Sequence, residues 1–535
     1  MKTTETTLPA LLRARAAEVP DKRYLIDVDD RELTYRGIVE QMDLWAAAWR
    51  RIGVGAGDIV VTMQTNTIES LTGWLGLASF DAVEAPINND YRGDLLAHAL
   101  NLTRARVFVV LRQFVDRLGE IADQLPHLKL VIVIDSDEPV GGLPFDVLTG
   151  TAFLEGVEPE PATYRPAMWD IGAILFTSGT TGPSKAVRMP WGQIHSTAIG
   201  TLPLKDFGPH DVIFNPGPTY HVGAKVFPFI AALVGGSHVM RPFISLARMP
   251  DEYRKYGVTT AFYPPFVWLD EPPKPGDKDI PLRNLLMPIQ LPRIEEFKER
   301  FGCRTFSAYS MTEMSCPIVD PDWNSGHVSA DGFVSCGKLR AGYPGYEIRI
   351  VDEYDQEVET GVVGELIVRS AVPWTMNAGY LNNAEATATG WRNGWFHTGD
   401  AFSRDAEGRY YFRDRIKDCI RRRMENISSF EVESYAKKHP EVLDCAAVAV
   451  KLGSEAGADE EIRLVVVRKP ESALDADALT RWLIPRMPRF MVPRFVEFMT
   501  ALPQTPTLKV QKIQLRNRPI AGVWDREKSG IELPR

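Results

Sequence analysis

Cysteine is scarce in this chain, with five residues in 535. The number is odd, the positions are far apart, and no two of them form a C-x-x-C pair; they are Cys303, Cys316, Cys336, Cys419 and Cys445. This distribution argues against a disulfide framework and against a zinc site built from cysteine pairs. It favours reduced thiols in a cytosolic protein.

Long apolar segments are also missing. Residues 1–12 are polar and lack the apolar core of a signal peptide, and no run of about 18 uninterrupted apolar residues occurs anywhere. We therefore expect neither a secretory leader nor a membrane span, and we expect a cytoplasmic protein.

A net positive charge is absent as well. The chain has 61 Lys and Arg against 70 Asp and Glu, so its formal charge is −9 at pH 7. An acidic chain has no general electrostatic attraction to nucleic acid or anionic lipid. We expect neither as a partner, and the content of 44% hydrophobic and 24% charged residues is typical of a globular protein.

The chain is too long for one hydrophobic core, which predicts two or more domains. Helical and strand-like patterns alternate along it, and this favours an α/β class with layered subdomains in a large N-terminal domain and a small α+β C-terminal domain. The expected helices are 11–17, 38–51 and 476–484, and the expected strands include 58–62, 107–111, 130–134, 446–450, 462–467 and 495–498.

The most informative stretch is TSGTTGPSK at 177–185, which follows the apolar run 171–176. The pattern predicts a buried strand that ends in a loop. Gly179 and Gly182 let backbone N–H groups approach an anion closely, and Lys185 adds a positive charge. Further donors are the hydroxyl groups of Thr177, Ser178, Thr180 and Thr181. The predicted ligand is a polyphosphate, with a flexible surface loop as the alternative.

This loop is not a Walker A loop. Pro183 and Ser184 separate Gly182 from the lysine, and Ala186 follows it, whereas the Walker pattern needs Gly-Lys-Ser/Thr in direct succession. A P-loop kinase is therefore disfavoured.

Four more strings follow in order. YSMTE lies at 309–313, GWFHTGD at 394–400, RDRIK at 413–417 and LPQTPTLK at 502–509. With the loop at 177–185, these strings resemble the adenylate-forming superfamily, which includes acyl-CoA synthetases, luciferases and peptide-synthetase adenylation domains. The resemblance extends from about residue 171 to residue 512 and implies ATP as a substrate.

The resemblance implies a role for each matching residue. Tyr309 would lie beside adenine, Thr312 would contact the α-phosphate, and Glu313 together with Thr177 would hold Mg²⁺, for which oxygen ligands are apt. Asp400 would accept hydrogen bonds from both ribose hydroxyls, as a carboxylate can. Arg415 would contact ribose and phosphate.

The same resemblance implies two domains. Residues 1–416 would form the adenylation core, and residues 417–535 would form a mobile lid that turns about a hinge at Lys417. Lys509 would reach the active site during adenylation, where a cation can bridge the carboxylate and the α-phosphate.

A histidine and a lysine follow the phosphate loop in the sequence. Pro218, His221 and Gly223 resemble a segment that borders the adenylate, which would give His221 a catalytic place; a lone histidine is otherwise more often structural. Lys225 is expected on the solvated surface, with the alternative that it pairs with a second anionic group on the substrate.

Several positions depart from the family pattern. Met424 stands where CoA ligases usually have a glycine beside the pantetheine arm, Ser310 and Leu508 also replace glycines, and residues 286–292 are bulky where the acyl pocket is usually lined by glycines. The identity of the acid substrate therefore does not follow from the resemblance to the family. The basic run at 421–423 is expected as a solvated face, or as a contact for CoA phosphates.

The resemblance therefore implies an ATP-dependent ligase that forms an acyl-adenylate and then an acyl-CoA, similar to the crotonobetaine/carnitine–CoA ligases. Alternatives that keep adenylation are an amine or carrier-protein acceptor, and nitrite activation as in ATP-dependent diazotases. A nucleotide-binding protein without catalysis is a third class. Besides ATP and CoA, the expected partner is a small acid, and a homodimer is left open.

Overall fold

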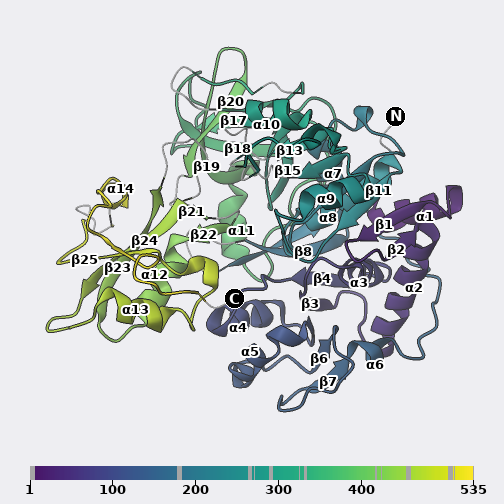
Figure 1. Cartoon of the computed structure of the whole chain (residues 1–535), viewed down its shortest axis with the longest axis horizontal. Helices are drawn as coiled ribbons and strands as arrows, with labels where there is room; N and C mark the ends of the chain where they lie inside the picture. The colour runs from purple at the N-terminus through teal and green to yellow at the C-terminus, as the bar shows by residue number, and fades with distance from the viewer. Residues whose placement is uncertain are drawn as a thin grey trace.

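The structure, a computed structural model, describes residues 6–177, 184–262, 268–269, 271–287, 293–323, 326–329, 334–415, 419–422, 425–452, 460–503, 510 and 512–533. Figure 1 shows the N-terminal helices and strands, a large central sheet region and a smaller C-terminal part that lies to one side. The predicted α/β class, with a large N-terminal part and a small α+β C-terminal part, is confirmed.

One sheet has five strands in the order β4-β3-β5-β6-β7, all paired in parallel. Their bounds are β3 (Ile59–Met63), β4 (Val83–Pro86), β5 (Val107–Val110), β6 (Leu130–Val133) and β7 (Asp146–Thr149). Strands β3, β5 and β6 confirm the predictions at 58–62, 107–111 and 130–134. Parallel strands are covered on both faces, which explains their nearly continuous apolar sequences.

Six helices belong to this N-terminal region in the described part of the chain. They are α1 (Leu8–Glu18), α2 (Tyr35–Arg51), α3 (Ile68–Ala78), α4 (Gly93–Thr103), α5 (Asp116–Gly119) and α6 (Gly150–Leu154). The predicted helices 11–17 and 38–51 correspond to α1 and α2. Helices α2 and α3 approach so closely that a Cβ atom added at Gly76 would lie 2.6 Å from Cβ of Trp45, so only glycine fits there.

The largest sheet has thirteen strands in the order β17-β18-β19-β20-β16-β15-β14-β13-β12-β10-β11-β1-β2. Pairing is parallel from β1 to β14 and antiparallel from β14 to β17. The bounds are β1 (Arg23–Asp27), β2 (Glu32–Thr34), β10 (Val212–Asn215), β11 (Ser237–Met240), β12 (Thr260–Phe262), β13 (Asn284–Met287), β14 (Arg304–Met311), β15 (Met314–Val319), β16 (Ser335–Leu339), β17 (Tyr346–Val351), β18 (Gly364–Ser370), β19 (Phe396–Arg404) and β20 (Arg409–Arg415).

Helices α7 and α8 pack against each other and against this sheet, α7 on β15 and α8 on β10 and β11. The helices of this region are α7 (Trp191–Thr201), α8 (Gly223–Val234), α9 (Met249–Tyr256), α10 (Ile294–Phe301) and α11 (Ala384–Gly390). Both α7 and α8 are buried along nearly their whole length, so polar side chains on them lie inside the protein.

A hairpin of two strands, β8 (Ile171–Thr177) and β9 (Lys185–Pro190), lies between the two large cores. Ile174 and Ala186 pack into one hydrophobic cluster, while Ala173 and Leu175 pack into the other. Successive side chains of a strand point to opposite faces, so a strand buried on both faces needs an unbroken apolar run. The predicted buried strand that ends at the loop is thus confirmed.

The C-terminal part contains a hairpin, a sheet of four strands and three helices among its described residues. The bounds are β21 (Cys419–Arg422), β22 (Glu425–Ser428), β23 (Val442–Lys451), β24 (Glu460–Arg468), β25 (Phe495–Met499), β26 (Trp524–Asp525), α12 (Ser429–Lys437), α13 (Ala476–Leu483) and α14 (Lys512–Arg516). The strands predicted at 446–450, 462–467 and 495–498 and the helix at 476–484 are confirmed. The stretch before α12 forms the hairpin β21–β22.

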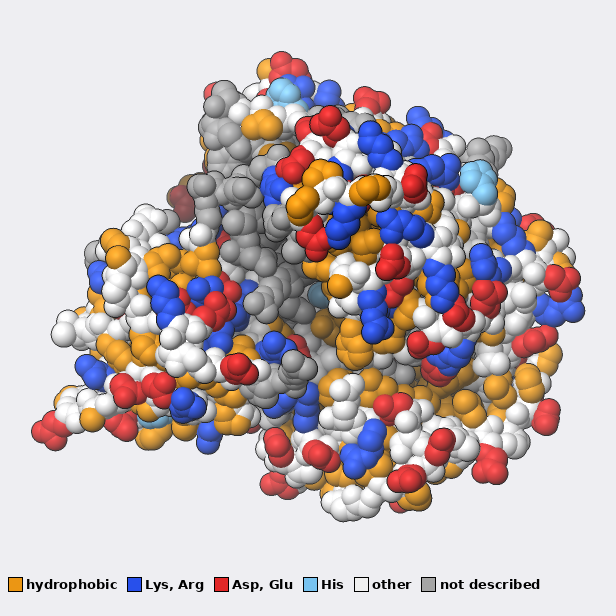
Figure 2. Space-filling view, in the orientation of Figure 1, with side chains coloured by type: hydrophobic (Ala, Val, Ile, Leu, Met, Phe, Trp, Pro, Cys, Tyr) orange, Lys and Arg blue, Asp and Glu red, His pale blue; other side chains and the backbone are white. Residues whose placement is uncertain are grey.

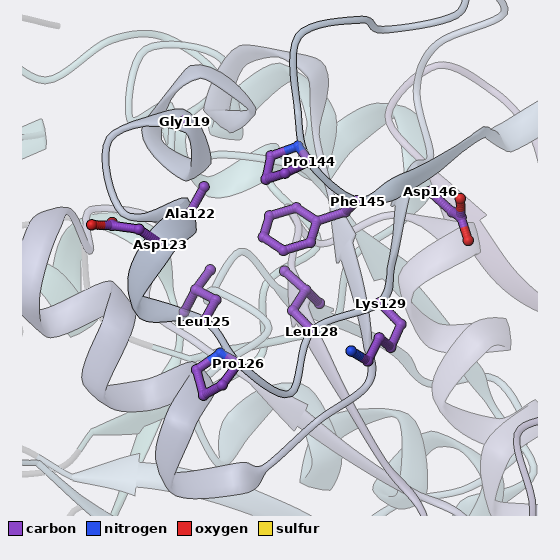
Figure 3. Close-up of a pocket in the computed structure, with 10 residues that line it drawn as sticks. All are labelled: Gly119, Ala122, Asp123, Leu125, Pro126, Leu128, Lys129, Pro144, Phe145 and Asp146. Carbon is purple, nitrogen blue, oxygen red and sulfur yellow. The ribbon is translucent and has the colours of Figure 1, made fainter.

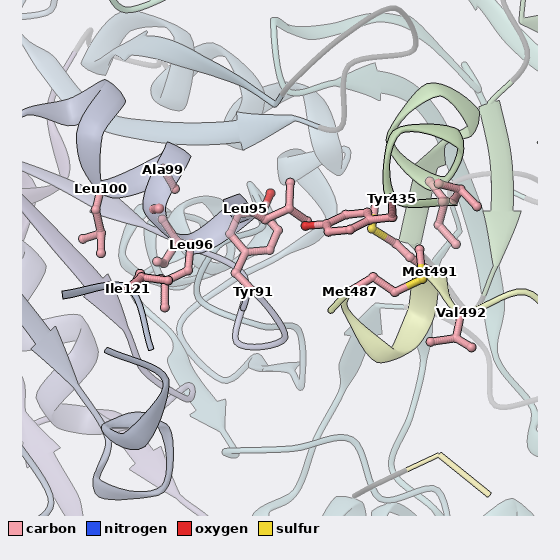
Figure 4. Packing of buried hydrophobic residues seen from close by; sticks show 14 of the residues in the cluster. Tyr91, Leu95, Leu96, Ala99, Leu100, Ile121, Tyr435, Met487, Met491 and Val492 are labelled. Carbon is pink, nitrogen blue, oxygen red and sulfur yellow. The ribbon is translucent and has the colours of Figure 1, made fainter. Parts of the chain in front are cut away.

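The C-terminal part packs against α4. Figure 4 shows Tyr91 and Leu95 of the N-terminal region on one side of a shared apolar cluster, with Tyr435 and Met487 on the other. An ion pair between Lys438 and Asp94 borders it. Residues 416–418 lie outside the described residues, so the boundary at 416/417 stays a prediction.

Arg422 does not lie on the solvated basic face that the sequence predicts. It is buried, its Nε lies 2.8 Å from Oε2 of Glu461, and its Nη1 donates hydrogen bonds to the carbonyl oxygens of Phe490 and Val492. An antiparallel hairpin turns alternate side chains inward, so a run of three arginines cannot stay on one face. The side chains of Arg421 and Arg423 lie outside the described residues.

Three further features of the structure are its cysteines, the character of its helices and the distribution of its surface charges. Four cysteines, Cys303, Cys316, Cys336 and Cys445, are buried. In the described part of the chain, no helix has both the length and the apolar character that a membrane crossing requires. Figure 2 shows basic and acidic side chains interspersed over the visible face.

Candidate active site

The hairpin β8–β9 brings the two ends of the predicted phosphate loop together. Thr177 and Lys185 are direct partners in its register. The residue before Lys185 is anchored, because the Ser184 hydroxyl lies 3.1 Å from Oη of Tyr91 and the Ser184 carbonyl lies 3.1 Å from Nε2 of His98. The predicted binding residues Ser178, Gly179, Thr180, Thr181 and Gly182 lie outside the described residues.

A chain of contacts leads from Lys185 to Glu313. Nζ of Lys185 lies 4.9 Å from the centroid of the Tyr380 ring, and Oη of Tyr380 donates a hydrogen bond of 3.1 Å to Oε1 of Glu313. Burial, reinforced by the Glu313 carboxylate, raises the pKa of Tyr380, so the phenol remains a donor. One aromatic ring therefore separates the loop cation from the predicted metal ligand.

Thr312 and Glu313 form the two-residue turn between β14 and β15. Nε2 of Gln193 on α7 donates to the Thr312 carbonyl at 2.8 Å, and Nδ2 of Asn377 donates to the Glu313 carbonyl at 2.7 Å. These bonds fix the backbone of the turn from both sides. The turn itself presents a threonine hydroxyl and a carboxylate as neighbours.

Tyr309 and Asp400 meet although four inter-strand steps separate β14 from β19. Oη of Tyr309 donates a hydrogen bond of 2.7 Å to Oδ2 of Asp400. In a flat sheet, four steps of about 4.8 Å would place these strands roughly 19 Å apart. The antiparallel half of the sheet must therefore curl strongly, and this curl brings the predicted adenine and ribose contacts together.

Glu365 supports the segment that carries Asp400. Its Oε1 accepts from the Gly399 N–H at 2.9 Å and its Oε2 lies 2.9 Å from Nδ1 of His397. Gly399 has a φ of +71°, a left-handed conformation that favours glycine. The conformation and the carboxylate together hold the buried Asp400 in place.

Arg415 is the last residue of β20 and pairs directly with Asp400 in the register of β19 and β20. Its backbone is therefore next to the predicted ribose contact. Its side chain lies outside the described residues, so its predicted contact with ribose and phosphate stays a prediction.

His221 lies in the turn ahead of α8, half-buried. Its ring centroid is 4.9 Å from that of Tyr220. Burial lowers the pKa of His221 to about 4, so the ring is neutral near pH 7 and can exchange a hydrogen bond without carrying charge.

Lys225 is not the solvated surface lysine that the sequence predicts. It is buried on α8, where it forms an ion pair with the equally buried Glu84 of β4, and its Nζ lies 4.2 Å from the centroid of the Trp74 ring. Oγ1 of Thr62 donates to Glu84 at 2.8 Å. Its charge is thus satisfied by the protein, which also removes the alternative that Lys225 is left to pair with a substrate.

Sequence reasoning assigned no role to Tyr380, Gln193 or Glu365. Their partners are 67, 119 and 34 residues away in the sequence, which no local motif reveals. The only signal was the position of Tyr380 in a polar loop after a glycine. Lys509, the predicted adenylation lysine, lies outside the described residues.

One hollow of about 690 Å³ lies elsewhere, beside β6 and β7. Figure 3 shows Leu125, Leu128 and Phe145 around it, with Asp123 and Lys129 at its edge. None of its lining residues is a predicted site residue, so it is separate from the cluster around Glu313.

Comparison with solved structures identifies the class of proteins that share this fold. A double mutant of o-succinylbenzoate CoA synthetase (MenE) from Bacillus subtilis, bound with its product analogue OSB-NCoA, matches with a TM-score of 0.80 and 20% identity, over 96% of this chain and 99% of that one. The amide bond synthetase McbA from Marinactinospora thermotolerans matches with a TM-score of 0.76 and 21% identity, over 95% and 99%. The fold is that of adenylate-forming enzymes.

The sequence matches then give the family. Residues 12–381 match the family described as AMP-binding enzyme, and residues 431–509 match the AMP-binding enzyme C-terminal domain. The chain belongs to the AMP-binding enzyme family. A crotonobetaine/carnitine–CoA ligase from Salmonella agona (strain SL483) is 28% identical over 501 residues, 91% of this chain and 93% of that protein. The predicted family and its resemblance to this type of ligase are confirmed.

Proposed function

We propose that the protein activates a small carboxylic acid with ATP and transfers the acyl group to CoA. The acid's carboxylate oxygen attacks the α-phosphorus, the bond to the bridging oxygen breaks, and pyrophosphate leaves. The CoA thiolate then attacks the acyl carbonyl, and AMP leaves as the thioester forms. The class of the relatives and the names of the CoA ligases among them support this proposal.

The observation that carries the proposal is the position of the β14–β15 hairpin. It holds Tyr309, bonded to Asp400, and Glu313, linked through Tyr380 to Lys185. In the proposed complex, Asp400 accepts from the ribose hydroxyls and Lys185 neutralises phosphate charge. Thr177 begins the phosphate loop, and Thr312 contacts the α-phosphate. His221 borders the adenylate as a neutral ring.

The residues fit a magnesium nucleotide. Mg²⁺ in nucleotide sites is bound by one or two carboxylates together with phosphate oxygens and waters, and Glu313 offers a carboxylate next to the phosphate loop. When bound, the ion would neutralise the charge that develops on the leaving pyrophosphate. Glu313 and Thr177 are the residues that we propose to hold it.

Residues 1–416 would carry this site, and residues 417–535 would form the lid that brings Lys509 to the α-phosphate. The proposed location is cytoplasmic. The proposed partners are the acid, ATP and CoA, without nucleic acid, and a homodimer stays an open prediction.

The test is AMP release from MgATP with a panel of carboxylic acids and nitrite, each with and without CoA. AMP that appears with one acid and rises with CoA supports the proposal; AMP from none of the acids contradicts it. Lys509→Ala should abolish adenylate formation and spare thioester formation from a supplied acyl-adenylate. Equal loss of both steps would show that Lys509 does not serve the first step alone.

A second candidate is an amide-forming ligase. Met424 in place of glycine, together with the similarity to an amide bond synthetase, favours it. It predicts AMP release that is independent of CoA but is accompanied by amide product when an amine is supplied.

A further inference from the structure

Arg340 is a buried arginine without an acidic partner. It follows β16 and is 8% exposed. Its backbone N–H donates to the Pro317 carbonyl at 2.8 Å, and Nη1 of its guanidinium donates to the Ser196 carbonyl at 2.9 Å. No carboxylate lies within ion-pair distance of it in the described part of the chain.

The other buried basic side chains that the structure describes are all paired. Lys225 pairs with Glu84, and the arginines lie 2.8 to 3.8 Å from their acidic partners. These pairs are Arg241–Glu252, Arg422–Glu461, Arg463–Glu497 and Arg526–Glu527. Burying a charge is costly unless it is paired, so the exception at Arg340 calls for an anion from outside the chain.

The surroundings of Arg340 are built for its guanidinium. A Cβ atom at Gly200 on α7 would lie 1.9 Å from Nη1, so the glycine leaves the space that the guanidinium occupies. His195, five residues earlier on α7, is fully buried, and neither of its ring nitrogens has a hydrogen-bond partner among the described residues. Its ring packs between Phe229 and Tyr343, with centroids 5.7 and 5.9 Å away.

The same elements lead from Arg340 to the candidate active site. Gln193 on α7 bonds the Thr312 carbonyl, and Gly200, which contacts Arg340, lies seven residues further along the helix. A rise of 1.5 Å per residue makes this separation roughly 10 Å. On the neighbouring strand, the Ser315 hydroxyl lies 3.0 Å from the Ser196 hydroxyl, beside the carbonyl that Arg340 binds.

We propose that Arg340 binds a second anionic group on the acid substrate, so that the enzyme selects a dicarboxylic acid over a monocarboxylic acid of equal length. This inference rests on the proposed function. Arginine suits the task because its planar guanidinium binds a carboxylate through two parallel hydrogen bonds.

The test compares α,ω-dicarboxylates from adipate to sebacate with monocarboxylates of equal length. The proteins are the wild type, Arg340→Gln, Arg340→Lys and, as a matched control, Arg241→Gln, which removes a buried arginine that is already paired. Two readouts are used: kcat/KM for AMP formation, and the shift in melting temperature that each acid causes without ATP.

We expect the wild type to prefer a diacid over its monoacid by about tenfold or more, the effect of one hydrogen bond to a charged group. Arg340→Gln should lose this preference, Arg340→Lys should keep part of it, and Arg241→Gln should keep all of it. A diacid should raise the melting temperature of the wild type and not that of Arg340→Gln.

If Arg340→Gln prefers diacids over monoacids as the wild type does, the inference is overturned. It is also overturned if diacids, or inorganic phosphate, raise the melting temperatures of the wild type and Arg340→Gln equally. AMP formation without diacid preference overturns it and leaves the proposed function standing. Stabilisation of the wild type alone by diacids, without AMP from any acid, overturns the proposed function and supports the anion site at Arg340.

Discussion

Lys225 and Arg340 are both buried cations in the packed region of α7 and α8, but of the two only Lys225 has a carboxylate partner among the residues that the structure describes. Glu84 and the Trp74 ring satisfy Lys225, although burial still lowers its pKa. Burial also lowers the pKa of Arg340, which has phenol and thiol neighbours instead of a carboxylate. The difference separates a charge that supports the fold from a charge that is available to a ligand.

The largest expected effect comes from breaking the complete pair. Lys225→Met leaves Glu84 buried without its cation, which should lower the free energy of unfolding by about 3–5 kcal/mol in urea denaturation. The exposed pair Lys255–Asp30 is the control, and Lys255→Met should have a far smaller effect on stability because solvent screens the pair. Similar losses in the two variants would contradict the structural role of the buried pair.

The contacts that lead from Lys185 through Tyr380 to Glu313 are a third kind of pairing, which we propose to serve catalysis. Glu313→Gln keeps an acceptor for Tyr380 but removes the charge, so it should lower AMP formation roughly hundredfold with little change in stability. Tyr380→Phe removes one hydrogen bond to a charged group, and a loss of about tenfold is expected. Wild-type rates in Glu313→Gln would remove Glu313 from the proposed metal site.

The pH dependence of stability should also distinguish the surroundings of Arg340 from those of Lys225. Burial, and then the charge of Arg340, lowers the pKa of His195 to about 4. The unfolded chain binds this proton near pH 6.5 and the folded chain does not, so stability should fall as pH decreases from about 6.5 to 4, by up to about 1.4 kcal/mol per pH unit.

His195→Gln should make this acid-side slope shallower, measured by thermal unfolding between pH 4 and pH 7. Arg340→Gln should act in the same direction, because removing the cation lets the histidine accept its proton at higher pH. His238, whose pKa burial lowers to about 3, lies on β11, and His238→Gln is the control that should flatten the slope irrespective of Arg340. Identical profiles in wild type and His195→Gln would exclude His195 as a contributor.

The smallest effect is expected at Tyr91, which lies between the phosphate loop and the C-terminal part. Its Oη lies 3.1 Å from the Ser184 hydroxyl, and its ring belongs to the cluster that includes Tyr435. Tyr91→Phe removes the hydroxyl and keeps the packing, so stability should fall by about 1 kcal/mol. AMP formation should fall less than in Tyr380→Phe. A larger loss of activity in Tyr91→Phe than in Tyr380→Phe would mean that the Tyr91–Ser184 contact matters more for AMP formation than the contact of Tyr380 with Glu313.

Local patterns predicted most of the secondary structure. The apolar run 171–176 became β8 because it is buried on both faces, and helical spacing at 38–51 became α2. Tyr309 and Asp400, which their motifs assign to adenine and ribose, meet in the structure through a hydrogen bond. Long-range partners were not predictable, because Tyr380, Gln193 and Glu365 contact site residues far away in the sequence.

The sequence by itself determined the family, the order of the site motifs and the strands and helices that carry them, because these depend on residue type and local spacing. Only the tertiary structure decided which charges are satisfied. It buried Lys225 and Arg422 with acids 141 and 39 residues away, and it left Arg340 without an acidic partner in the described part of the chain. Pairing of buried charges depends on which distant side chains meet in a medium of low dielectric constant, and no local pattern records that meeting.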